Sequence, residues 1–224
     1  MNSSLIIWIL ISTSFITYFI VSMVYKKLGI HNLQSALMVN NGLRLLNLKH
    51  GLGIILFGIV FYTILPDLRY LIQIIEIPRL FLLLLFFATL FLSAYLSRES
   101  VKKQLSKIER ASCYNLSNAS VYFMIRFVFL LCYEFFFRGI LFFKFLEYNS
   151  LFVAIFYSTI LYVLIHIFDS RKEIIGSIPF GIVLCLFAYY TNSVCYVFLI
   201  HIALSAVYEI SLFYHLTIKN KILS

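Results

Sequence analysis

The sequence predicts an all-α protein, a polytopic transmembrane helical bundle with about seven spans. Of the 224 residues, 62% are hydrophobic and 12% are charged, and the mean hydropathy is +0.98. A soluble domain averages about 45–50% apolar and about 25% charged residues. A water-soluble fold of this length could not bury so much Leu, Ile, Phe and Val, so lipid must be the solvent for most of the surface. The lipid bilayer is therefore the first expected partner.

Apolar runs define the expected spans, because a membrane helix needs about 20 apolar residues. The runs cover residues 4–25, 51–65, 80–97, 119–147, 151–168, 175–191 and 194–216. The first run is too long for a signal peptide, and lysines rather than a cleavage site follow it, so we expect a transmembrane helix. The mixed segment 66–79 is expected to be interfacial and amphipathic. The fourth run is too long for a simple span and should be tilted, broken or partly interfacial.

The basic residues predict the topology. Lys and Arg gather in residues 26–50 and 98–118, after the fifth run and after the seventh, whereas residues 148–150 and 192–193 hold none. By the positive-inside rule we expect a multi-pass membrane protein with its N-terminus outside and its C-terminus cytoplasmic. This placement also accounts for the net charge of +9, so nucleic acid is not an expected partner. With no repeat or long linker, residues 1–224 are expected to form a single integral membrane domain.

Four ionisable side chains stand out within the apolar runs, Glu134, Arg138, His166 and His201, and three others in the runs are of secondary interest: Arg126, Lys144 and Glu209. Each costs roughly 2.5–3.5 kcal/mol on insertion scales, and such groups usually face the bundle interior or a wet cavity. Glu134 and Arg138 are four residues apart and could simply pair on one helix face. A lone intramembrane His is as often a hydrogen-bonded structural residue as a chemical one. Together, however, an acid, a guanidinium and two imidazoles on three helices could supply acid–base groups and oxyanion donors.

No metal or other cofactor is predicted. A Glu and two His could bind a metal, but the sequence has no HExxH motif and no second carboxylate is expected near either His. The four cysteines are scattered without CxxC spacing, so neither a disulfide framework nor a zinc site is expected. The other histidines, which lie near span ends or in loops, receive no role: His31, His50 and His215.

Three motifs within residues 120–210 resemble those of the CPBP family, the CAAX-protease and bacteriocin-processing (Abi) intramembrane endopeptidases. The family's Glu-Glu-x-x-x-Arg motif is matched by Tyr133-Glu134-Phe135-Phe136-Phe137-Arg138. An aromatic residue separated from a His by three residues is matched by Tyr162 and His166. The third motif, His-x-x-x-Asn, is matched by His201 and Ser205. The motifs occur in the family's order at plausible intervals.

The resemblance implies hydrolysis of a peptide bond inside the membrane, by water that a Glu and a His activate. Two positions depart from the pattern: Tyr133 stands where the family has its first Glu, and Ser205 replaces Asn. A phenol, with a reference pKa of about 10, is a poor base at neutral pH. Under this interpretation Glu134 acts as base with His166, and His201 and Ser205 stabilise the oxyanion. Arg138 and Tyr133 are then supporting residues, and the substrate is a peptide or a membrane protein. The resemblance also implies that the protein lies in the cell membrane.

Two alternatives stay open. A catalytically inactive family member could serve as a membrane scaffold, immunity factor or regulator. A small transporter could use Glu134 and the histidines as a proton relay, although no inverted repeat is visible.

The depths of the two histidines conflict with a shared site. His166 lies near the cytoplasmic end of run 151–168, whereas His201 lies seven residues from the outer end of run 194–216. At 1.5 Å per residue their depths differ by roughly 20 Å. We therefore expect one boundary to be misplaced, so that the fifth helix continues through residues 169–173 or the seventh starts deeper.

Overall fold

The computed structural model describes residues 3–73, 77–105 and 116–219, which are helical without any β-strand. Within these residues seven helices are long and apolar enough to cross a membrane: Ser4–Lys27, Gly42–Ile64, Leu80–Leu105, Ala119–Leu146, Leu151–Phe168, Arg171–Thr191 and Val194–Leu216. The predicted fold class is confirmed, and the protein is a multi-pass helical membrane protein.

The second span is longer than predicted. The first span, α1 (Ser3–Lys27), leads through the short α2 (Leu33–Met38) to α3 (Gly42–Gly53), and a π-helical turn and α4 complete the second span: η1 (Ile54–Ile59) and α4 (Val60–Ile64). The start at residue 51 was wrong because the polar residues among positions 42–50 masked the span. His50 is therefore buried eight residues inside this span, and its expected position near a span end was also wrong.

The third span, α5 (Leu80–Leu105), continues eight residues beyond the predicted end at residue 97. Before it, the 3-10 helix η2 (Pro66–Ile72) packs against the start of α10, while Pro66 and Asp67 remain exposed. Leu71 is fully buried there, and the Ser193 hydroxyl donates to the Gln73 carbonyl at 2.9 Å. Residues 74–76 of the predicted interfacial segment lie outside the described residues.

The long fourth run forms one continuous helical segment with a change of winding in its middle. It consists of α6 (Leu116–Glu134), the π-helical η3 (Phe135–Leu141) and α7 (Phe142–Leu146). A π-turn closes i→i+5 hydrogen bonds and is frequent at functional sites. The wide turn begins directly after Glu134 and contains Arg138, and every residue of η3 is buried. The helix therefore continues through the run but changes from α to π winding next to Glu134 and around Arg138.

The fifth and seventh spans begin and end close to the predicted positions. The fifth is α8 (Leu151–Ile165), which ends in the 3-10 turn η4 (His166–Phe168); the sixth is α9 (Arg171–Thr191). The seventh is α10 (Val194–Phe213), followed by η5 (Tyr214–Lys219). The expected boundary error was therefore wrong, since the fifth helix stops before Asp169 and the seventh starts at Val194.

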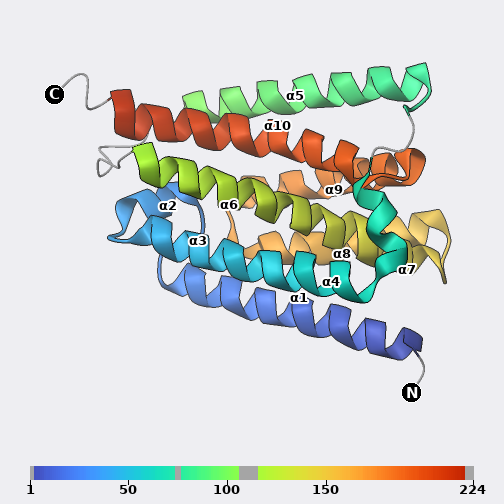
Figure 1. Ribbon diagram of the computed structural model, residues 1–224. Helices are drawn as coiled ribbons and strands as arrows, with labels where there is room; N and C mark the ends of the chain where they lie inside the picture. Colours follow the sequence, from blue (N-terminus) through green and yellow to red (C-terminus); the bar gives the residue numbers. More distant parts are fainter. Residues whose placement is uncertain (1–2, 74–76, 106–115, 220–224) are drawn as a thin grey trace.

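In the bundle, α10 lies between α5 and α6, and α1 lies at the opposite edge from α5 (Figure 1). The two chain ends lie at opposite ends of the bundle, as an odd number of spans requires (Figure 1). The predicted cytoplasmic connections, α1–α2 and α8–α9, lie at the same end as the C-terminus (Figure 1).

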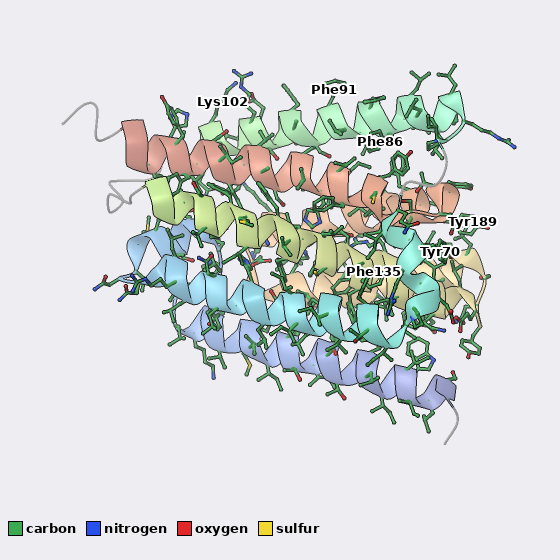
Figure 2. All side chains as sticks on the ribbon, viewed as in Figure 1. Tyr70, Phe86, Phe91, Lys102, Phe135 and Tyr189 are labelled. Carbon is green, nitrogen blue, oxygen red and sulfur yellow. The ribbon has the colours of Figure 1, made fainter. Side chains whose placement is uncertain are left out.

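Aromatic side chains fill the interior, as the sequence's 24 Phe and 16 Tyr allow. Phe86 of α5 points toward α10 and is buried, whereas Phe91 and Lys102 of the same helix point away from the bundle (Figure 2). At the centre, Phe57 of η1 stacks on Phe136 of η3 with ring centroids 4.4 Å apart. The two π-helical turns therefore pack against each other beside the charged residues.

Candidate active site

Glu134 and Arg138 form a fully buried ion pair in the fourth span. Arg138 Nη1 lies 3.0 Å from Glu134 Oε2, and neither side chain has appreciable exposed surface. The guanidinium also covers the Tyr162 ring of α8, with Cζ 3.9 Å from the ring centroid. A cation over an aromatic face is attracted by the ring quadrupole, most strongly when water is excluded. Tyr162, the aromatic residue of the second motif, thus stabilises the positive charge of Arg138 in the first motif.

The second carboxylate oxygen, Glu134 Oε1, binds His201 Nδ1 of α10. An ionised carboxylate can only accept hydrogen bonds, so the proton of this bond belongs to the imidazole. His201 is 6% exposed, and Phe180 of α9 packs edge-on against its ring. Glu134 therefore connects two helices that are far apart in sequence.

Tyr133 lies between the two histidines. Its ring centroid is 6.5 Å from that of His166 and 6.2 Å from that of His201. Its hydroxyl is buried and has no hydrogen-bond partner among the described residues. The rings of Phe57 and Phe137 contact it, at 6.0 and 4.6 Å between centroids. The two imidazole rings therefore lie no more than about 13 Å apart, so the expected separation of roughly 20 Å was wrong although the helix boundaries stand.

His166 is held at the end of α8. Its Nδ1 binds Asp169 Oδ2 at 2.8 Å, and its ring packs edge-on against Tyr162 at 4.7 Å between centroids. The other ring nitrogen, Nε2, is buried and has no hydrogen-bond partner in the described part of the chain. His166 therefore reaches the cluster through Tyr133 and Tyr162, and no direct bond to Glu134 or His201 is seen in the described residues.

Ser205 lies one helical turn after His201 on α10 and is half-buried. Positions four apart share a helix face, so its hydroxyl is on the His201 side of α10. Two polar groups of the site, His166 Nε2 and the Tyr133 hydroxyl, are buried without a hydrogen-bond partner among the described residues. Glu134 Oε2 and Arg138 Nη1 face each other in the ion pair at 3.0 Å.

Comparison with known proteins gives one match. Residues 115–207 match the family model described as type II CAAX prenyl endopeptidase Rce1-like. This region is Rce1-like. The resemblance predicted from the three motifs is confirmed over this part of the chain. Neither a curated protein nor a solved structure matches the sequence.

The Rce1-like region contains all six predicted site residues, and also Asp169, which the sequence analysis did not select. The only sequence signal for Asp169 is its spacing of three residues after His166. Residues three apart can also meet on a continuing helix, so the expectation that no second carboxylate lies near either His was wrong: Asp169 bonds to His166.

A second buried polar cluster lies two helical turns away from the Rce1-like site on the same two helices. Glu209 of α10 accepts from the Tyr122 hydroxyl at 2.8 Å and pairs with Arg126 Nη2 at 2.9 Å. His50 of α3 packs beside Tyr122 and stacks on Phe129, at 5.9 and 4.8 Å between ring centroids. Arg126 and Glu209, noted in sequence only as ionisable residues in spans, satisfy each other here.

Within the described residues, no group of three or more His, Cys, Asp or Glu side chains is placed to hold a metal ion. The cysteines in that part of the chain, Cys132, Cys185 and Cys195, are all free. The polar side chains gathered in the Rce1-like region are carboxylate, imidazole, guanidinium and hydroxyl groups.

Proposed function

We propose that this protein is an intramembrane endopeptidase that hydrolyses a peptide bond in a peptide or membrane-protein substrate. The observation that carries the proposal is the Glu134 carboxylate, fully buried between Arg138 and His201, with His166 one tyrosine ring away. Burying ionisable groups in a membrane costs free energy, so such groups are usually functional. These groups come together from three helices within the region that matches a protease family.

The acceptors of the site suit the activation of water. A carboxylate offers about four lone-pair positions, so Glu134 can still accept from water while it binds Arg138 and His201. Glu134 and His166 Nε2 accept hydrogen bonds from the attacking water, and one proton of that water passes to one of these two bases. The oxygen bonds to the carbonyl carbon, the C–N bond breaks, and the proton passes to the leaving amine.

The donors of the site suit the developing oxyanion. His201 Nε2 can donate to the oxyanion when the ring is protonated, while Nδ1 keeps its bond to Glu134. Ser205 adds a hydroxyl from the next turn of α10, and Arg138 adds a buried positive charge. Donors fixed in advance by a low-dielectric site act on the transition state without reorganisation.

The test is cleavage by the purified protein in lipid vesicles. The substrates are a farnesylated CAAX-type peptide, chosen from the description of the matching family, and a set of transmembrane peptides without a prenyl group, with products identified by mass spectrometry. We expect Glu134→Gln, His166→Ala and His201→Ala each to reduce cleavage by about 100-fold or more. Glu147→Gln, which alters an exposed carboxylate of the same helical run paired with Lys144, is the control and should cleave normally. Cleavage that survives Glu134→Gln would refute the proposal.

Tyr133 favours a second candidate, a family member that has lost proteolysis and acts as a scaffold or regulator. Tyr133→Glu separates the two candidates, because it restores the family's paired acids. An inactive protein that gains cleavage on this change has a decayed site. An active protein that loses cleavage on this change uses Tyr133 as it stands.

A further inference from the structure

We infer that Asp169 is a positioning residue for His166: it fixes the imidazole in the Nδ1–H form, with Nε2 turned into the site as a proton acceptor. The inference rests on the proposed hydrolysis and adds to it a residue that lies outside the three motifs. It follows from the local backbone, the hydrogen bonding of the ring and the surroundings of its two nitrogens.

The backbone places the two side chains in line. The α-helix α8 ends at Ile165, and the chain tightens into a 3-10 turn in which the Asp169 amide donates to the His166 carbonyl at 2.9 Å. In 3-10 geometry the side chains at positions i and i+3 eclipse. The tightened turn therefore brings the Asp169 carboxylate directly over the His166 ring edge, where the two bond at 2.8 Å.

The bond selects one tautomer. A carboxylate only accepts, so the proton between the groups sits on Nδ1, and Nε2 of the neutral ring keeps its lone pair. A bare Nε2 can take a proton from water, whereas the opposite tautomer would present an N–H and could not. Without the carboxylate, neither tautomer would be imposed by this contact.

One nitrogen of the His166 ring faces a partly exposed carboxylate, and the other nitrogen is buried. Asp169 is 22% exposed on its side chain, so its charge is partly solvated. Nε2, by contrast, is buried without a protein partner among the described residues, on a ring that packs against Tyr133 and Tyr162. The ring that carries the free nitrogen thus lies beside Tyr133 of the first motif.

The first turn of α9 contains another carboxylate, Glu173, which bonds to a serine and not to an imidazole. Glu173 accepts from the Ser170 hydroxyl at 3.0 Å, and Ser170 caps α9 by accepting from the Glu173 amide. Glu173→Gln therefore alters the same connection without touching an imidazole, which makes it the matched control.

The experiment records nitrogen spectra of the full-length protein labelled with ¹⁵N-histidine in detergent micelles, with His166→Gln used to assign the resonances. We expect His166 to carry its proton on Nδ1 in the wild type and in Glu173→Gln. In Asp169→Ala it should become a mixture of tautomers. Asp169→Asn retains the shape of the side chain and is the second variant, in case the alanine variant misfolds; its His166 proton should also lose its preference for Nδ1. A wild-type His166 protonated on Nε2, or a spectrum unchanged in both Asp169 variants, would overturn the inference.

Kinetics with any peptide that the wild type cleaves gives the second measurement. Asp169→Asn should lower kcat by about tenfold or more with KM nearly unchanged, because it affects proton transfer rather than binding. A rise in KM alone would contradict a positioning role. If no peptide is cleaved while the spectra behave as expected, the proposed hydrolysis fails and the role of Asp169 in holding the ring stands.

Discussion

Glu134 of α6 binds His201 of α10, and this contact sets the register of the two antiparallel helices. Eight residues before Glu134, Arg126 meets Glu209, which lies eight residues after His201. Eight residues of helix rise by roughly 12 Å, so the two contacts clamp the same interface at two depths. The charge order is reversed between them, with the acid on α6 in one and on α10 in the other. A sliding of either helix would break both contacts together.

Replacing Arg138 with Met should strongly destabilise the protein, because Glu134 would keep a buried charge without its guanidinium. Breaking a buried pair costs about 3–5 kcal/mol, whereas replacing both partners by apolar residues is often tolerated. We therefore expect the double variant Glu134→Leu/Arg138→Met to recover much of the lost unfolding free energy. The measurement is denaturation in mixed micelles followed by circular dichroism. Lys144→Met is the control, since Lys144 pairs with an exposed Glu147, and its effect should stay within about 1 kcal/mol. Equal losses for Arg138→Met and Lys144→Met would contradict the buried pair.

Removing the charge of Glu209 should cost more than removing its hydrogen bond from Tyr122. Glu209→Gln leaves Arg126 without its anion at a site that is only 17% exposed on the arginine side chain, and we expect a loss of about 1–3 kcal/mol. Tyr122→Phe removes one hydroxyl, and hydrogen bonds between membrane helices average about 0.6 kcal/mol. The same denaturation assay compares the two. A larger effect of Tyr122→Phe would show that the hydroxyl, not the ion pair, holds this part of the interface.

Gly58 should not tolerate a side chain. A Cβ at this position would collide with the Cys132 side chain of α6, whereas a Cβ at Gly51 meets nothing within 4 Å. Overpacking costs about 1–3 kcal/mol, and Gly costs up to about 1 kcal/mol relative to Ala within a helix. Gly58→Ala should therefore destabilise the protein, and Gly51→Ala should leave its stability unchanged or raise it. Adding Cys132→Gly to Gly58→Ala should restore stability; a double variant no better than Gly58→Ala would place the clash elsewhere.

The predicted topology can be tested with single cysteines in a variant lacking the natural ones. With the N-terminus outside, Asn149→Cys should react with a membrane-impermeant maleimide on intact cells. Lys27→Cys and Arg171→Cys should react only after the membrane is opened. All three positions are exposed in the structure, so access is limited by the bilayer alone. The reverse labelling pattern would show that the basic connections lie outside.

The sequence predicted the ends of some spans well, and it predicted the residues of the site better than their contacts. The fifth span was predicted to within a residue because its flanks carry clear turn and charge signals. The second was shortened because Arg44, Asn47 and Lys49 broke its apolar run. The motifs selected Glu134, His166 and His201 as a group. The division of contacts was not predictable, because the sequence suggested Glu134 beside His166 and the structure bonds it to His201.

The sequence by itself determined the seven spans and the choice of polar residues within them. Lipid forces each crossing segment to satisfy its own backbone hydrogen bonds, so length and hydropathy are sufficient to find the helices. Only the tertiary structure decided which polar groups meet. The bond between Glu134 and His201 joins helices that are 67 residues apart in sequence, and no local pattern encodes it. The 3-10 turn that brings Asp169 to His166 is local, but the apolar run gives no sign of where the α-helix ends.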